Sequence, residues 1–189
     1  MGAYLTTPIT KKTSISGEGN GIKFAASSMQ GWRTSMEDAH ISEPQFTHNS
    51  SLFAVFDGHG GSDVAKFCSE TFAQELKSNK NFGLGKIKDS LKETFYLMDE
   101  LLTKKSSKAS LPSYMRGAYT QTQAGATANV ILIYDGHIYC ANAGDSRTVV
   151  WSGDRLVKLS FDHKPTGPGE ARRILNAGGV IANGRINNG

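Results

Sequence analysis

The sequence has 189 residues, of which 38% are hydrophobic and 20% are charged, with 21 basic and 17 acidic side chains. A chain of this length suits one globular domain with a sizeable core, and the composition excludes a wholly disordered protein. The basic residues are scattered, and the densest group, at 104–108, lies among serines in a stretch typical of a solvated loop. We therefore expect no nucleic-acid partner.

Residues 1–21 are rich in Thr, Gly and Ser, and we expect a flexible segment there, ahead of a domain at 22–189. Within that domain, short apolar runs predict strands, and apolar residues at helical spacing predict amphipathic helices. The first elements expected are strands at 22–29 and 52–56 and helices at 64–76 and 87–102.

The second half of the chain is richer in strand patterns. A polar stretch at 103–124 predicts an exposed loop because of its length and composition. Two hairpins follow, the first with an Asp-Gly turn, and then a short helix that ends at a Gly-Gly pair. The hairpins are expected at 128–143 and 149–159, and the helix at 169–177. Strands and helices are grouped and do not alternate strictly, so we expect an α+β fold with antiparallel sheet.

The N-terminus carries a candidate lipidation site at Gly2. The first six residues, MGAYLT, fit the M-G-x-x-x-[ST] pattern for N-myristoylation, and the alternative is a chance match to a short pattern. One myristoyl chain binds membranes with a constant of only about 10⁴ M⁻¹, so membrane association through Gly2 would be reversible.

The expected compartment is intracellular, cytoplasmic or nuclear. The first twelve residues lack an apolar core of signal-peptide length. Cys68 falls on the apolar side of a predicted helix and Cys140 inside a predicted strand, so we expect two buried free thiols. Free thiols indicate a reducing environment.

Three polar groups lie in turns or at the ends of predicted strands. They are RTSMEDAH at 33–40, DGHGG at 57–61 and NAGDSR at 142–147. Taken alone, the first could be a surface salt-bridge cluster, and the other two could be glycine-rich turns.

Together, these groups hold the parts of a metal-assisted phosphate hydrolysis. Carboxylates suit hard cations such as Mg²⁺ or Mn²⁺, and a glycine such as Gly58 lets its carbonyl approach a metal without a side chain in the way. Arginine binds phosphate through two parallel hydrogen bonds, and histidine transfers protons near neutral pH. Two metal ions about 3.5–4 Å apart would activate a water molecule and stabilise the leaving oxygen.

Other phosphate and metal sites do not match the sequence. The G-x-x-x-x-G-K-[ST] phosphate loop is absent, and the two cysteines and five histidines are too dispersed for a zinc site. A cysteine phosphatase loop places an arginine after five intervening residues. Ser146 occupies that place after Cys140, and Arg147 comes one position late.

Five longer strings resemble the metal-dependent type 2C protein serine/threonine phosphatases, the PPM family. The strings are SSMQGWRTSMEDAH (27–40), FAVFDGHGGSDVAKFC (53–68), ANAGDSR (141–147) and DHKP (162–165), followed by EARRILNAGG. Their order and spacing also agree with the family, over roughly residues 20–189. The resemblance implies an α/β sandwich of two central antiparallel sheets flanked by helices, acting as a monomer on phosphoserine and phosphothreonine proteins.

The resemblance also implies a centre of two Mg²⁺ or Mn²⁺ ions, with a weaker third. By position, Asp57 would bridge two ions and the Gly58 carbonyl would bind one of them. Glu37 and Asp38 would hold metal-bound waters, and Asp145 would contribute to the third site.

Two further residues acquire substrate roles from the same resemblance. Arg33 would bind the substrate phosphate, and His59 would protonate the departing seryl or threonyl oxygen. The metal-bridging water would attack phosphorus directly, which is why no cysteine or serine nucleophile is needed.

The family carries two more metal-binding aspartates, and the acidic residues after position 147 do not match their context. On this comparison the sequence is expected to be C-terminally truncated, and the activity of the 189-residue chain is left open. Two hypotheses follow: a metal-dependent phosphatase, or a catalytically inactive phosphatase-like protein that binds phosphoproteins or a partner.

Overall fold

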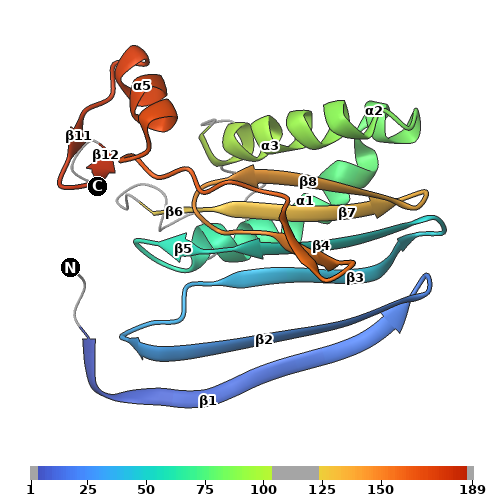
Figure 1. Ribbon diagram of the computed structural model, residues 1–189, viewed down its shortest axis with the longest axis horizontal. Helices are drawn as coiled ribbons and strands as arrows, with labels where there is room; N and C mark the ends of the chain where they lie inside the picture. Colours follow the sequence, from blue (N-terminus) through green and yellow to red (C-terminus); the bar gives the residue numbers. More distant parts are fainter. Residues whose placement is uncertain (1–3, 104–123, 187–189) are drawn as a thin grey trace.

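The computed structural model describes residues 4–103 and 124–186 (Figure 1). The helices are α1 (Asp63–Ser78), α2 (Lys80–Gly83), α3 (Ile87–Thr103) and α5 (Pro168–Asn176). The longer strands are β1 (Tyr4–Gly19), β2 (Ile22–Arg33), β3 (Ala39–Thr47), β4 (Ser50–Phe56), β7 (Ala128–Tyr134) and β8 (His137–Ala143). The shorter strands are β5 (Gly58–His59), β6 (Gly125–Ala126), β9 (Val149–Ser152), β10 (Arg155–Lys158), β11 (Ile181–Ala182) and β12 (Arg185–Ile186).

Four antiparallel strands form the central sheet, in the order β3-β4-β7-β8. Residues that face each other across the ladder point to the same side of a sheet, and neighbours along a strand point to opposite sides. The register pairs Leu52 with Leu132 and Ala54 with Val130 on one side. It pairs Phe53 with Ile131 on the other side. The sheet therefore has two distinct faces.

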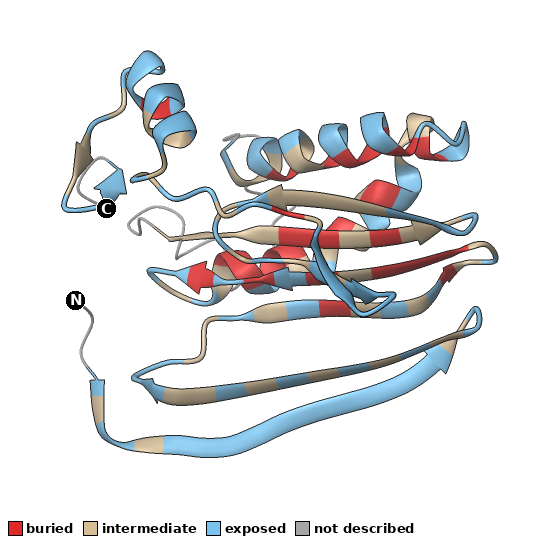
Figure 2. Cartoon of the chain, in the orientation of Figure 1, coloured by how far each residue is buried: buried red, intermediate tan, exposed pale blue. Residues whose placement is uncertain are grey.

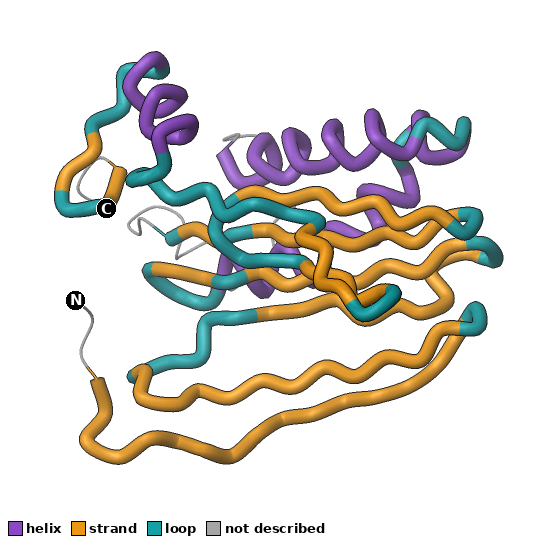
Figure 3. Tube along the Cα trace, in the orientation of Figure 1, coloured by secondary structure: helices purple, strands orange, loops and turns teal. Residues whose placement is uncertain are grey.

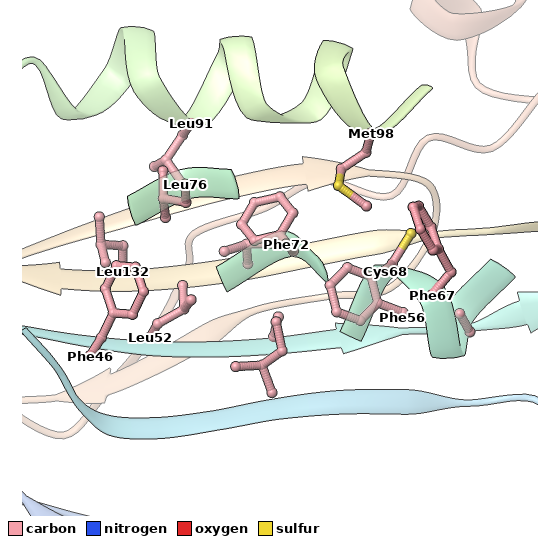
Figure 4. Packing of buried hydrophobic residues seen from close by; sticks show 14 of the residues in the cluster. Phe46, Leu52, Phe56, Phe67, Cys68, Phe72, Leu76, Leu91, Met98 and Leu132 are labelled. Atoms are coloured by element: carbon pink, nitrogen blue, oxygen red, sulfur yellow. The ribbon is translucent and has the colours of Figure 1, made fainter. Parts of the chain in front are cut away.

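The face that carries Leu52 and Leu132, here called the helix face, is covered by α1 and α3. Figure 2 shows the buried residues concentrated where these helices meet the sheet. Phe72 of α1 lies at the centre, with its ring 6.2 Å from that of Phe56 and 5.6 Å from that of Phe95. Figure 4 shows Phe72 and Phe56 between the helices and the strands, with Leu91 and Met98 of α3 pointing toward them. Apolar burial on this face is the main source of the fold's stability.

The opposite face, here called the hairpin face, carries Phe53, Val55, Asn129, Ile131 and Cys140. The β1–β2 hairpin reaches it through Phe24, whose ring centre lies 5.7 Å from that of Phe53. A cavity of about 710 Å³ lies between β2, this face and residues 146–148. Val55 is 48% exposed, so packing on the hairpin face is looser than on the helix face.

The predicted flexible segment at 1–21 is wrong for Tyr4–Gly19, which forms β1 and pairs along most of β2. Figure 3 shows the two strands running beside the sheet as one long antiparallel hairpin. Asn20 and Gly21 form the two-residue turn, with φ values of 49° and 74°, the left-handed conformation that such hairpins require. The Asn20 amide also donates to the carbonyls of Thr47 and Ser50, at 2.9 and 2.8 Å. These bonds fix the tip of the hairpin to the β3–β4 turn.

The other predicted elements are confirmed, including both later hairpins and the helix α5. The sequence pattern missed β3, because Pro44 and several polar residues interrupt its alternation. The expected α+β fold with antiparallel sheets is likewise confirmed.

Both cysteines are free, and Cys68 is buried as predicted, but the burial predicted for Cys140 is wrong because that residue is only partly buried. No helix in residues 4–103 or 124–186 has the length and apolar character needed to cross a bilayer. Gly2 and most of the predicted loop at 103–124 lie outside the described residues.

Candidate functional site

The site is built around the turn that follows β4. Phe56 at the end of this strand is fully buried, whereas Asp57 is exposed. Thr127 binds the backbone of Asp57 on both sides: its hydroxyl accepts from the Asp57 N–H at 3.1 Å, and its own N–H donates to the Asp57 carbonyl at 2.9 Å. The backbone of Asp57 is thereby fixed, and its side chain takes no part in either bond.

Gly58 is a place of close backbone approach. Its N–H donates to the carbonyl of Glu37 at 3.2 Å, and a Cβ at this position would lie only 2.4 Å from that oxygen. Any residue with a side chain would push the two segments apart. Glycine therefore allows the segment with Glu37 and Asp38 to lie against the turn with Asp57.

Asp38 and Asp57 bring two carboxylates together. Burial raises the pKa of Asp38, and the charge and hydrogen bonding of Asp57 raise it further, while the nearby Arg33 guanidinium partly offsets this. Two carboxylates in contact repel each other when both are ionised, and a divalent cation between them relieves that repulsion. The all-oxygen donor set fits a hard cation such as Mg²⁺ or Mn²⁺.

Glu37 points its carboxylate at the glycine-rich turn. Ser35 donates its hydroxyl to one oxygen at 2.6 Å, and the Gly61 N–H lies 3.4 Å from the other. These bonds hold the turn against the segment after β2. The role of Glu37 as a holder of metal-bound water stays a prediction.

His59 lies on β5, paired with Gly125 of β6. A Cβ at Gly125 would come within 2.7 Å of the His59 Nε2, so the imidazole ring packs directly against this backbone. The ring remains exposed, as proton exchange with a substrate would require.

Asp145 lies on a separate loop after β8. Its carboxylate is 3.9 Å from the Lys164 ammonium, and this lysine also lies 3.8 Å from Asp162. The neighbouring Ser146 hydroxyl is 2.7 Å from that of Thr127, the residue that holds Asp57. The structure therefore links the Asp145 loop to the Asp57 turn, while the carboxylate of Asp145 contacts a lysine.

Of the predicted site residues, Arg33, Glu37, Asp38, Asp57 and Gly58 come together at one end of the central sheet. Across residues 4–103 and 124–186, no three His, Cys, Asp or Glu side chains converge as a ready metal-binding group. Among these residues, Asp38 and Asp57 form a carboxylate pair on which no third such side chain converges.

Sequence reasoning missed Thr127, which no catalytic pattern marks. The available signal was its place in the short stretch GATA, directly before the β7 pattern. A hydroxyl at the start of a buried strand can bind a neighbouring turn, although its partner cannot be read from the sequence.

Comparisons with known proteins identify the family of the chain. The family model described as protein phosphatase 2C matches residues 22–189. Probable protein phosphatase 2C 2 of Paramecium tetraurelia is 49% identical over 187 residues, and probable protein phosphatase 2C 21 of Arabidopsis thaliana is 38% identical over 222. Each alignment covers 99% of this chain and 62% of the relative, so the chain spans less than two thirds of their length.

Solved structures agree in fold. A serine-threonine phosphatase 2C from Toxoplasma gondii superposes with a TM-score of 0.57 at 19% identity, covering 94% of this chain and 59% of that one. A C. elegans sex determining protein superposes with a TM-score of 0.62 at 24% identity, covering 95% of this chain and 41% of that one. With the family model matched over residues 22–189, the chain belongs to the protein phosphatase 2C family.

Proposed function

We propose that this protein is a Mg²⁺- or Mn²⁺-dependent protein serine/threonine phosphatase that hydrolyses phosphoserine and phosphothreonine. The observation that carries the proposal is the close approach at Gly58, whose N–H donates to the Glu37 carbonyl at 3.2 Å and so brings the segment with Glu37 and Asp38 against the turn with Asp57. A carboxylate pair next to a guanidinium supplies a cation site and a phosphate site side by side.

The cation would be held by Asp57 directly, by the Gly58 carbonyl, and through water by Glu37 and Asp38. When bound, a hard divalent cation lowers the pKa of a bound water and neutralises charge on the phosphate. Asp145 is the candidate for a weaker additional site. Mg²⁺ and Mn²⁺ both suit these oxygen donors.

The remaining chemistry falls to side chains of the same end of the sheet. Arg33 would bind two phosphate oxygens and orient the ester. His59 would donate a proton to the leaving seryl or threonyl oxygen. The bonds from Thr127 to Asp57 would keep the carboxylate in place during the reaction.

Phosphoproteins are the proposed partners, bound by a monomer inside the cell. If Gly2 is myristoylated, the same protein would associate reversibly with membranes. Incorporation of a labelled myristate into the protein, lost on Gly2→Ala, would test this part separately.

The test of the main proposal compares the wild type with Asp57→Asn. Mn²⁺ binding is followed by electron paramagnetic resonance, and turnover is measured on a phosphothreonine peptide. We expect Asp57→Asn to lower kcat/KM at least about 100-fold and to weaken Mn²⁺ binding at least about 10-fold. The control is Asp154→Asn, because Asp154 lies in the β9–β10 turn at φ 61°, a conformation that asparagine tolerates.

The two readouts also separate the alternatives. Turnover that requires Asp57 supports the phosphatase. Binding of Mn²⁺ and phosphopeptide that requires Asp57, without turnover, supports the non-catalytic phosphatase-like protein. If Asp57→Asn changes neither Mn²⁺ binding nor turnover, both alternatives are wrong.

A further inference from the structure

A group of polar residues lies on the hairpin face of the sheet, with Asn129 and Ser160 buried and the others partly buried. Its centre is Asn129 of β7, which is 6% exposed, and its other members are Asn142, Ser146, Thr148 and Ser160. We call this group the Asn129 cluster. Val55 and Ile131, two neighbours of Asn129 on the same face, are apolar, whereas its cross-strand partner Asn142 is polar.

One asparagine side chain contacts four residues. Its amide nitrogen lies 2.7 Å from the Asn142 Oδ1, with the Ser160 hydroxyl and the Ser146 carbonyl farther away at 3.3 and 3.4 Å. Its amide oxygen accepts from the Thr148 hydroxyl. Asn129 thus joins β8 to three points on the segment that follows.

That segment has little other support from the sheet. Within the described residues, β9 and β10 pair only with each other. The Thr148 N–H donates to the Ser160 hydroxyl at 2.8 Å, and the Asn142 amide donates to the carbonyls of Gly144 and Phe161, both at 3.0 Å. Side-chain bonds of the cluster therefore fix both ends of the β9–β10 hairpin.

The cluster continues directly to the Asp57 turn. Ser146 reaches the Thr127 hydroxyl at 2.7 Å, and Thr127 binds the Asp57 backbone on both sides. Gly144 also packs on Thr127, where an added Cβ would lie 2.6 Å from the Thr127 Cγ2. Asp145 lies between these two contacts.

We propose that Asn129 is a positioning residue that sets the Asp145 loop against the Asp57 turn. The proposal rests on the proposed function only in the claim that this arrangement serves cation binding. Burying an amide is unfavourable unless all its hydrogen bonds are made, and a satisfied network fixes one geometry. The geometry that the Asn129 network fixes includes the Asp145 loop and, through Ser146 and Thr127, the Asp57 turn.

The test uses Asn129→Leu, which keeps the volume but removes the bonds. Hydrogen exchange is measured without metal at residues 57–61 and 144–148, and Mn²⁺ binding is measured by electron paramagnetic resonance. We expect exchange about tenfold faster in both segments and Mn²⁺ binding about tenfold weaker.

A matched control excludes a general loss of stability. Thr94 is fully buried on α3 and donates to the Ser90 carbonyl at 2.8 Å, so Thr94→Val also removes a buried hydrogen bond. This variant should leave both readouts unchanged. Thr148→Val should reproduce the effect of Asn129→Leu, and Thr148→Ser, which keeps the hydroxyl, should not.

Unchanged exchange at residues 57–61 in Asn129→Leu would overturn the proposal. So would a Thr94→Val variant with the same loss of Mn²⁺ binding. If the wild type binds no Mn²⁺ but Asn129→Leu accelerates exchange in both segments, the proposed function fails while the coupling between the two loops is supported.

Discussion

On the helix face of the central sheet Leu52, Val130 and Leu132 are fully buried, whereas on the hairpin face Val55 is 48% exposed and Asn129 is buried by polar partners. The same strands build both faces, because side chains alternate along a strand. The helix face is apolar and closely packed by α1 and α3. The hairpin face carries the hydrogen bonds that lead to Asp57.

The contrast indicates that the two faces of the sheet have different roles. Apolar burial is non-directional and its stabilisation grows with the area removed from water, so it suits stability. Hydrogen bonds are directional, so they suit the placement of loops. Substitutions on the helix face should therefore change stability first, and those on the hairpin face should change the site first.

The largest effect is expected from Phe72→Ala. Phe72 is 1% exposed and contacts the rings of Phe56 and Phe95, so its removal should lower the free energy of unfolding by about 3–5 kcal/mol. Urea denaturation measures this change. Val55→Ala is the counterpart on the hairpin face and should cost less than about 1.5 kcal/mol, because half of the Val55 side chain is already in water. Equal losses would contradict the division between the faces.

The two cysteines allow a chemical comparison of the faces. Burial raises the pKa of Cys68 to about 12, with a smaller contribution from the charge of Asp99. Burial also raises the pKa of Cys140, while the neighbouring Thr148 hydroxyl partly lowers it. The thiolate is the reactive form, so Cys140 should react with Ellman's reagent about tenfold faster than Cys68 at pH 8.

Cys140→Ser separates the two signals, because only the slow thiol remains in this variant. A fast reaction of the remaining Cys68 thiol in Cys140→Ser would show that the helix face opens more readily than its burial suggests. Loss of the fast phase alone is the expected result.

Apolar periodicity predicted α1, α3, β4, β7 and β8 because these elements contribute most of the helix face. The same signal failed for β1, whose residues are mostly exposed and whose stability comes from pairing with β2. The Asn20-Gly21 turn was a usable sign of that hairpin, since Asn-Gly strongly favours a two-residue turn.

The acidic residues of the candidate site could be selected from the sequence, because Asp57, Glu37 and Asp38 stand in recognisable strings. The residues that hold these acidic segments in place could not be selected from the sequence. Thr127 lies 70 positions from Asp57, and Asn129 lies 19 positions from Thr148. These contacts depend on strand order and register, which local patterns do not specify.

The smallest effect is expected where Asp38 meets Asp57 without a cation. Burial and the neighbouring carboxylate raise the pKa of Asp38 in the folded protein. A raised carboxyl pKa means that the folded state binds the proton more tightly than the unfolded state does. Its stabilising contribution is therefore present below pH 3.8, the ordinary Asp value, and is lost as the pH rises through the folded pKa. At pH 7 the ionised pair should then be mildly destabilising.

Asp38→Asn should accordingly stabilise the metal-free protein at pH 7 by less than about 1 kcal/mol, because Asp38 is only partly buried and solvent still screens the pair. Thermal unfolding in EDTA at pH 4 and pH 7 measures the change, and the gain should be larger at pH 7. Added Mn²⁺ should reverse the order, because the wild type gains stability from a bound cation and the variant gains less. A variant less stable than the wild type in EDTA at pH 7 would mean that Asp38 is held by favourable contacts, and the case for a cation between the two carboxylates would lose its physical basis.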